Sequence, residues 1–157
     1  MIWGEGPIQA ILLTSEGATS ATLNLERPVE REIEDYEDVR LTIGTDADGQ
    51  PVERFLGVRF HAVYSWISHS GNQDNMATVQ RLANWRGDGK QVRLIPHTDE
   101  TGHAILCEVR SNPIMPYDGK LTAEEIRIEV YGVSVLAQKP NPAYDRVGRG
   151  RGLVIAA

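Results

Sequence analysis

The sequence predicts a mainly β (α+β) fold, an antiparallel β-sandwich or small barrel with one flanking helix and an extended C-terminal arm. Three observations lead to this fold class. Apolar and polar residues alternate along several short segments bounded by turn-forming residues, which is the pattern of half-buried strands. One segment near the middle changes to helical spacing, and glycine and proline accumulate after residue 138. We therefore predict a β domain over residues 1–137 and an extended arm over residues 138–157.

Two hairpins are predicted in the first half of the chain. Residues 8–14 and 22–25 form the first, because residues 15–17 between them favour a turn. The second surrounds the turn signal at residues 46–51, which joins an alternating segment at residues 39–43 to the longest strand. On that strand, period-two spacing places six apolar residues on the core face: Leu56, Val58, Phe60, Ala62, Tyr64 and Trp66.

One helix and a second group of strands are predicted in the other half. The helix lies near residues 73–86, with Asn72 or Asp74 expected to cap its start and Gly87 its end. Residues 91–96 and 103–110 are expected to form a third hairpin. In the last strand, residues 125–136, the apolar positions change parity across Gly132, which predicts a β-bulge there. Four apolar residues share one side of the helix: Met76, Val79, Leu82 and Ala83.

Charge and composition exclude several classes of protein. The formal net charge of −6 disfavours a general affinity for nucleic acid, which comes mainly from lysine and arginine. No apolar stretch approaches the roughly 20 residues of a membrane-spanning helix, so no membrane insertion is expected. Residues 26–38 hold seven acidic residues against two arginines. They predict a solvated or lumen-facing acidic surface made of Glu30, Glu32, Glu34, Asp35, Glu37 and Asp38.

No motif predicts catalysis, a cofactor or a metal site. His97, Asp99, Glu100 and His103 are close in sequence, but no standard zinc spacing matches them, and a polar hairpin tip is expected instead. The acidic turn at residues 46–49 lacks the later ligands of a calcium loop. The only cysteine, Cys107, excludes an intramolecular disulfide and is expected to be buried and inert.

The C-terminal arm is predicted to bind a partner protein. Glycines separate its arginines, as in segments that contact RNA, but three arginines in an acidic protein favour a docking role. An apolar tip follows them. The residues expected to dock are Arg146, Arg149, Arg151, Leu153, Val154 and Ile155.

Residues 54–136 resemble the tail-tube and distal-tail proteins of long-tailed bacteriophages. The resemblance rests on the strand Arg-Phe-Leu-Gly-Val-Arg-Phe-His-Ala-Val-Tyr-Ser-Trp at residues 54–66, the helix that follows it, the strand at residues 92–96 with Asp99 shortly after it, and the long strand at residues 126–135. It implies a β-sandwich with one packed helix that assembles into rings, commonly hexameric. These rings form either the tube that carries DNA or the adaptor at its tip.

The expected function is therefore that of a structural subunit of a phage tail, in the tail tube or a distal-tail or baseplate ring, rather than an enzyme. Its expected partners are further copies of itself, other tail proteins and DNA in transient passage through an acidic channel. The expected location is the virion tail, after synthesis in the host cytoplasm. The alternative is a β-sandwich module that binds a sugar or peptide on an exposed strand face at His61, Ser65 and His69.

Overall fold

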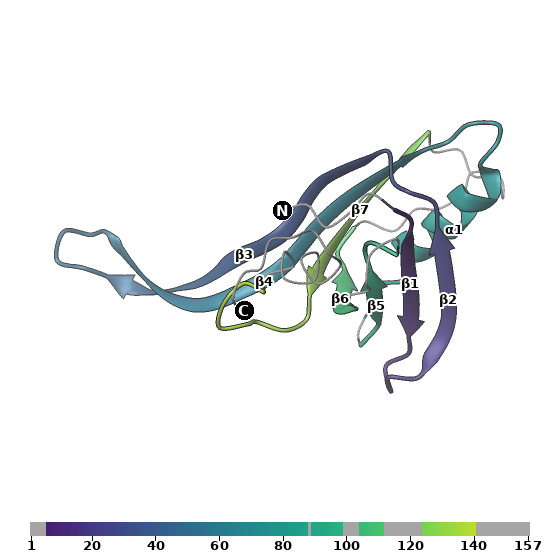
Figure 1. The fold of residues 1–157 in the computed structure, drawn as a ribbon. Helices are drawn as coiled ribbons and strands as arrows, with labels where there is room; N and C mark the ends of the chain where they lie inside the picture. Colours follow the sequence, from purple (N-terminus) through teal and green to yellow (C-terminus); the bar gives the residue numbers. More distant parts are fainter. Residues whose placement is uncertain (1–5, 88, 99–103, 112–123, 141–157) are drawn as a thin grey trace, which may run out of the picture.

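The computed structural model describes residues 6–87, 89–98, 104–111 and 124–140. Seven antiparallel strands and a single helix, α1, make up this part of the chain (Figure 1), which confirms the mainly β fold with one flanking helix. No helix in the described ranges is long and apolar enough to cross a membrane. The elements are β1 (Ile8–Leu13), β2 (Thr19–Leu25), β3 (Glu30–Thr45), β4 (Pro51–Ile67), α1 (Gln73–Ala83), β5 (Gln91–Ile95), β6 (Ile105–Val109) and β7 (Glu125–Gly132).

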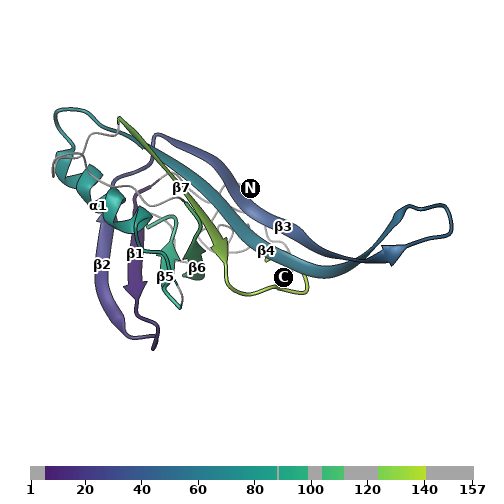
Figure 2. The ribbon, with the colours of Figure 1, turned by 180° about the vertical axis from the view of Figure 1, so that it is seen from behind.

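The seven strands form one continuous sheet, in the order β2-β1-β5-β6-β7-β4-β3. Strands β1 and β2 run at a large angle to β3 and β4 (Figures 1 and 2), so the sheet is strongly curved. Helix α1 contacts β2 near one end of the strand order and β7 and β4 near the other. A single curved sheet and one helix therefore enclose the core that a two-sheet sandwich would otherwise enclose.

Alternation along each strand supplies the core, as the sequence predicts. The inward side chains of β4 from Val58 to Trp66 are at most 6% exposed, and those of β1, β5 and β7 join them in one apolar cluster. Helix α1 adds the four apolar residues predicted for it. It ends at Ala83 rather than near residue 86, and Asn72 makes no capping bond because its side chain binds the backbone of Ile67 and His69.

Two glycines allow close backbone approaches around β4. Gly57 has a φ of 139°, and a Cβ at this position would overlap the backbone oxygen of Leu136. That contact belongs to a β-bridge in which the backbones of Val58 and Leu136 exchange two hydrogen bonds of 2.8 Å. A Cβ on Gly132 would lie 3.1 Å from the Cβ of Phe60. Strand β7 keeps its register against β4 up to Tyr131 and ends at Gly132, where Phe60 lies against the glycine. The bridge between Val58 and Leu136 is two residues out of that register, so the irregularity predicted at Gly132 follows directly after this residue and is not a bulge within β7.

Strands β3 and β4 continue beyond the rest of the sheet as a narrow extension, here called the distal hairpin (residues 40–56; Figure 1). It begins where Val39 pairs with Gly57 and Arg40 with Phe55, so that Leu56 is an extra residue in β4. Six residues of β3 extend from there to the turn, a length of about 20 Å. The turn forms as predicted, with the Asp46 carboxylate accepting hydrogen bonds from the backbone of Asp48 and Gln50.

Candidate functional site

The acidic residues predicted to form one surface lie along β3, but they do not share one environment. Glu34 is 8% exposed and points into the core, so it does not belong to an acidic surface. The cause is an irregularity between Arg31 and Ile33, which leaves Glu32 without a cross-strand partner and turns both Arg31 and Glu34 inward. The other five acids are partly or fully exposed: Glu30, Glu32, Asp35, Glu37 and Asp38.

Four of those five exposed acids are paired with bases of the same chain. Glu32 pairs with Arg127, and this hydrogen bond raises the pKa of the Arg127 guanidinium. Asp35 lies 3.2 Å from Lys139. The remaining pairs are Glu37 with His61 at 2.5 Å and Asp38 with Arg40 at 3.1 Å. Exposed pairs of this kind contribute only about 0–1 kcal/mol each, but they reduce the negative charge that the surface presents.

A buried polar cluster surrounds Glu34. One carboxylate oxygen accepts hydrogen bonds from Tyr64 Oη at 2.6 Å and Arg31 Nη1 at 3.0 Å, and the other lies 2.5 Å from His97 Nε2. Burial, followed by the charge of Glu34, raises the pKa of Tyr64 well above its ordinary value. The predicted place of His97 at a polar hairpin tip is wrong, because its side chain is 3% exposed and completes this cluster.

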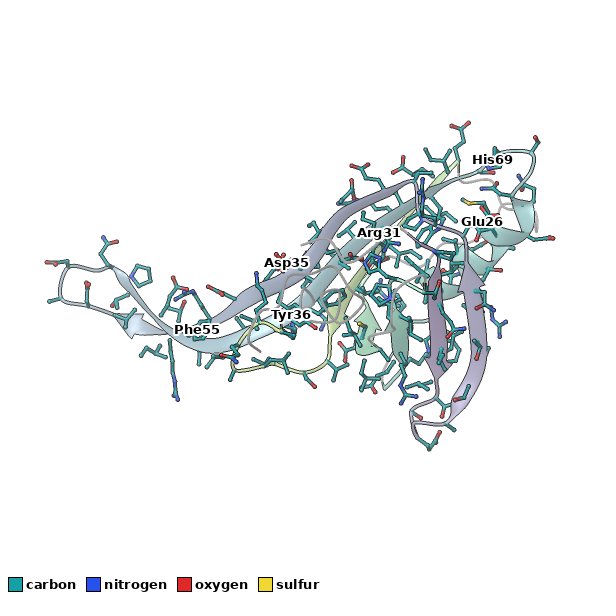
Figure 3. All side chains as sticks on the ribbon, in the orientation of Figure 1. Glu26, Arg31, Asp35, Tyr36, Phe55 and His69 are labelled. Carbon is teal, nitrogen blue, oxygen red and sulfur yellow. The ribbon has the colours of Figure 1, made fainter. Side chains whose placement is uncertain are left out.

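The cluster joins elements that are far apart in the strand order. Arg31 donates to the backbone oxygens of Pro96 and Gly6, which follow β5 and precede β1. Strand β3 at one edge of the sheet is thereby connected to β1 and β5 near the other (Figure 3 labels Arg31). Both carboxylate oxygens of Glu34 are bonded and enclosed, so this cluster holds the curved sheet together rather than presenting a reactive group.

The exposed strand face predicted at His61, Ser65 and His69 does not form. Ser65 is 2% exposed and His61 is 6% exposed. The His61 ring lies between the carboxylates of Glu37 and Glu129, at 2.5 and 2.9 Å, and stacks on Tyr131 with ring centroids 4.3 Å apart. These partners come from β3 and β7, so sequence spacing along β4 gave no sign of them. The site expected for a sugar or peptide is therefore occupied by the chain's own side chains.

The distal hairpin carries the largest group of exposed apolar side chains in the described part of the chain. Of the large hydrophobic residues that are exposed in the described part of the chain, half lie on this hairpin: Leu41 (51% exposed), Ile43 (61%), Val52 (39%), Phe55 (48%) and Leu56 (45%). Figure 3 shows Phe55 on this extension and Tyr36 nearer the body. Leu56 was predicted in the core, but the extra residue in β4 removes it from the buried row. Exposed apolar groups concentrated on one projection are typical of interaction sites.

Other predicted sites remain without structural description. The docking residues of the C-terminal arm, 146–155, and three of the four metal candidates, Asp99, Glu100 and His103, lie outside the described residues. Within the described ranges, no group of three or more His, Cys, Asp and Glu side chains is placed to hold a metal ion. No protein-family model matches this chain, and no curated protein sequence is significantly similar to it.

Proposed function

We propose that this protein is a non-enzymatic structural subunit that assembles with copies of itself into rings in the tail of a long-tailed bacteriophage, as tail tube or as distal-tail or baseplate ring. The phage context comes from the resemblance of residues 54–136 to such proteins. The single observation that supports an assembly role is the distal hairpin, which projects from the body and exposes five large apolar side chains.

In a free monomer, the apolar side chains of the distal hairpin would stay exposed to water, which is unfavourable. Removing apolar surface from water is favourable by roughly 25 cal/mol per Å², so five exposed side chains favour a hairpin covered by another surface. Among the described residues, the strands of this hairpin pair only with each other. Both of its outer edges therefore offer backbone groups that a neighbouring strand can pair with.

Repetition of one contact is sufficient to build a ring. A projection that binds a different surface on the next copy makes a head-to-tail contact, and such contacts close into rings when the rotation between copies allows it. In a tail ring, the acids Glu30, Asp35 and Glu37, which the register against β4 places on one face of β3, would face the channel and repel the phosphates of passing DNA. The pairing of Asp35 with Lys139 and of Glu37 with His61 would keep that repulsion moderate.

Light scattering and negative-stain imaging of the purified full chain test this function. A matched variant replaces residues 41–54 with Asn-Gly, which joins the opposed residues Arg40 and Phe55 by a two-residue turn. We expect rings or tubes from the full chain and monomers from the shortened chain. Circular dichroism should show that the shortened chain keeps the secondary structure of the remaining residues. A second variant ending at Ala137 tests the C-terminal arm. A full chain that remains monomeric at high concentration would overturn the proposal.

A further inference from the structure

The outer face of the sheet, opposite the core, carries a mixed apolar and basic surface far from the distal hairpin. Cross-strand register places Thr22, Ile11, Arg93 and Leu106 directly side by side across β2, β1, β5 and β6. Val133 adjoins this row, because its backbone N–H donates to the backbone oxygen of Leu106 at 2.8 Å. Ile11, Arg93, Leu106 and Val133 together form this surface, the Arg93 patch.

The Arg93 patch is open to solvent and has a basic residue at its centre. Leu106 is 36% exposed and Val133 is 37% exposed. The side chain of Arg93, on β5 between β1 and β6, is also exposed. On the same face, Glu108 lies two residues from Leu106 and is paired with Arg110 at 2.9 Å, so Arg93 is the charged group at the centre of the patch. The patch therefore combines apolar contact area with positive charge.

The distal hairpin has the complementary character. Residues 40–56 have three acids, Asp46, Asp48 and Glu53, and two bases, Arg40 and Arg54, of which Arg40 is paired with Asp38. Its exposed apolar side chains lie on β3 and β4, as does Glu53, while Asp46 and Asp48 lie in the turn that joins these strands. The hairpin and the patch both expose apolar side chains, and their charges are opposite in sign. Complementary charge favours the correct pairing over others.

We propose that the distal hairpin of one copy docks on the Arg93 patch of a second copy. The hairpin cannot reach the patch of its own chain, because it points away from the end of the molecule where β1, β2 and β5 lie (Figures 1 and 2). Docking of two hairpins on each other would instead bring Asp46, Asp48 and Glu53 of both copies together, which like charges oppose. This inference rests on the proposed function and names the surface that the assembly uses.

Two knockout variants separate the two halves of this contact. The hairpin variant, Leu41→Thr with Ile43→Thr, removes apolar area but keeps β-branched residues in β3. The patch variant, Arg93→Glu with Leu106→Thr, reverses the central charge and removes its apolar neighbour. The matched control is Ile67→Thr, which changes an isoleucine that is 45% exposed at the opposite end of β4. Light scattering against concentration gives the assembly midpoint of each, and thermal unfolding checks that each is folded.

We expect the hairpin variant and the patch variant each to raise the assembly midpoint about tenfold or more, whereas the control assembles like the original chain. An equimolar mixture of the two variants provides the sharper result. Only the intact hairpin of one can bind the intact patch of the other, so the mixture forms a dimer of one copy of each and grows no further. Assembly that ends at a 1:1 dimer is expected only when the contact joins two different surfaces.

Three outcomes would overturn the inference. If the patch variant assembles normally while the hairpin variant does not, the hairpin binds another surface, and the proposed function stands without this interface. If both variants assemble normally, assembly uses other parts of the chain. If the original chain does not assemble at high concentration, both the interface and the proposed function fail.

Discussion

Arg31 and Glu34 form an ion pair on the inner side of β3, with 3.0 Å between Nη1 and Oε2. Residues three apart on a regular strand point to opposite faces, so this contact requires an irregularity. The register of β3 against β4 shifts between Arg31 and Ile33, and the extra residue, Glu32, turns outward to Arg127. One inserted residue thus produces both a buried ion pair and a surface ion pair.

Replacing Glu34 with alanine is expected to destabilise the fold strongly. The change leaves the Arg31 guanidinium, with a side chain 14% exposed, and the fully enclosed Tyr64 hydroxyl without their carboxylate. Removing one partner of a buried pair costs about 3–5 kcal/mol of unfolding free energy. Urea denaturation measures the loss. The control Glu30→Ala, at an exposed position of the same strand, should stay within about 0.5 kcal/mol, and a similar value for Glu34→Ala would contradict the role given to the cluster.

The stability of the fold is expected to decrease in strong alkali. Burial raises the pKa of Tyr36 to about 12, and it raises the pKa of Tyr64 well above its ordinary value. A folded-state pKa above the unfolded value of about 10 means that the folded chain keeps protons that the unfolded chain releases. The stabilisation from Tyr36 is complete below pH 10 and is lost as the pH rises from 10 through 12. Denaturation midpoints should follow this course, and Tyr36→Phe should make it shallower. A midpoint unchanged over that range would contradict the burial of these phenols.

Cys107 is expected to react with thiol reagents only when the protein unfolds. Its side chain is fully buried, and burial raises the pKa of the thiol far above its ordinary value, so the reactive thiolate is scarce. Because it is the only cysteine, absorbance from an aromatic disulfide reagent reports this one residue. We expect negligible reaction in native buffer and one equivalent in concentrated urea. Rapid stoichiometric labelling of the native protein would show that the core at β6 is open.

Replacing Gly57 with alanine is expected to break the bridge between β4 and Leu136. The new Cβ would overlap the backbone oxygen of Leu136, and the φ of 139° at this position strains any residue other than glycine. A loss of about 1–3 kcal/mol is expected in thermal or urea unfolding. Gly71→Ala is the matched control, since a Cβ there meets only ordinary contacts of 3.4 Å with His69. Equal stability of the two variants would contradict the close approach.

Local patterns predicted much of the fold. Alternation along residues 8–14 and 56–66, the turn at residues 46–51 and helical spacing after residue 73 gave the first two hairpins and α1, because each depends on neighbours in sequence. The buried cluster could not be predicted in this way. Glu34 and His97 are 63 residues apart, and which acid of a charged strand points inward depends on one inserted residue.

The exposed hairpin was also beyond sequence reasoning, for a different physical reason. Leu41 and Ile43 alternate with polar residues just as core strands do, so the pattern predicts burial. The structure instead carries β3 and β4 past the end of β7, where the described chain offers nothing to cover them. Periodicity identifies the apolar face of a strand but not the surface that covers it, which here we assign to a second copy.

The most direct test of the central claim, that the distal hairpin is the assembly element, is hydrogen–deuterium exchange at low and high protein concentration. We expect the amides of residues 40–56 to exchange markedly more slowly as the particle mass rises, while the amides of α1 change little. Exchange in residues 40–56 that stays fast in assembled particles would contradict the claim, because the hairpin would then remain uncovered.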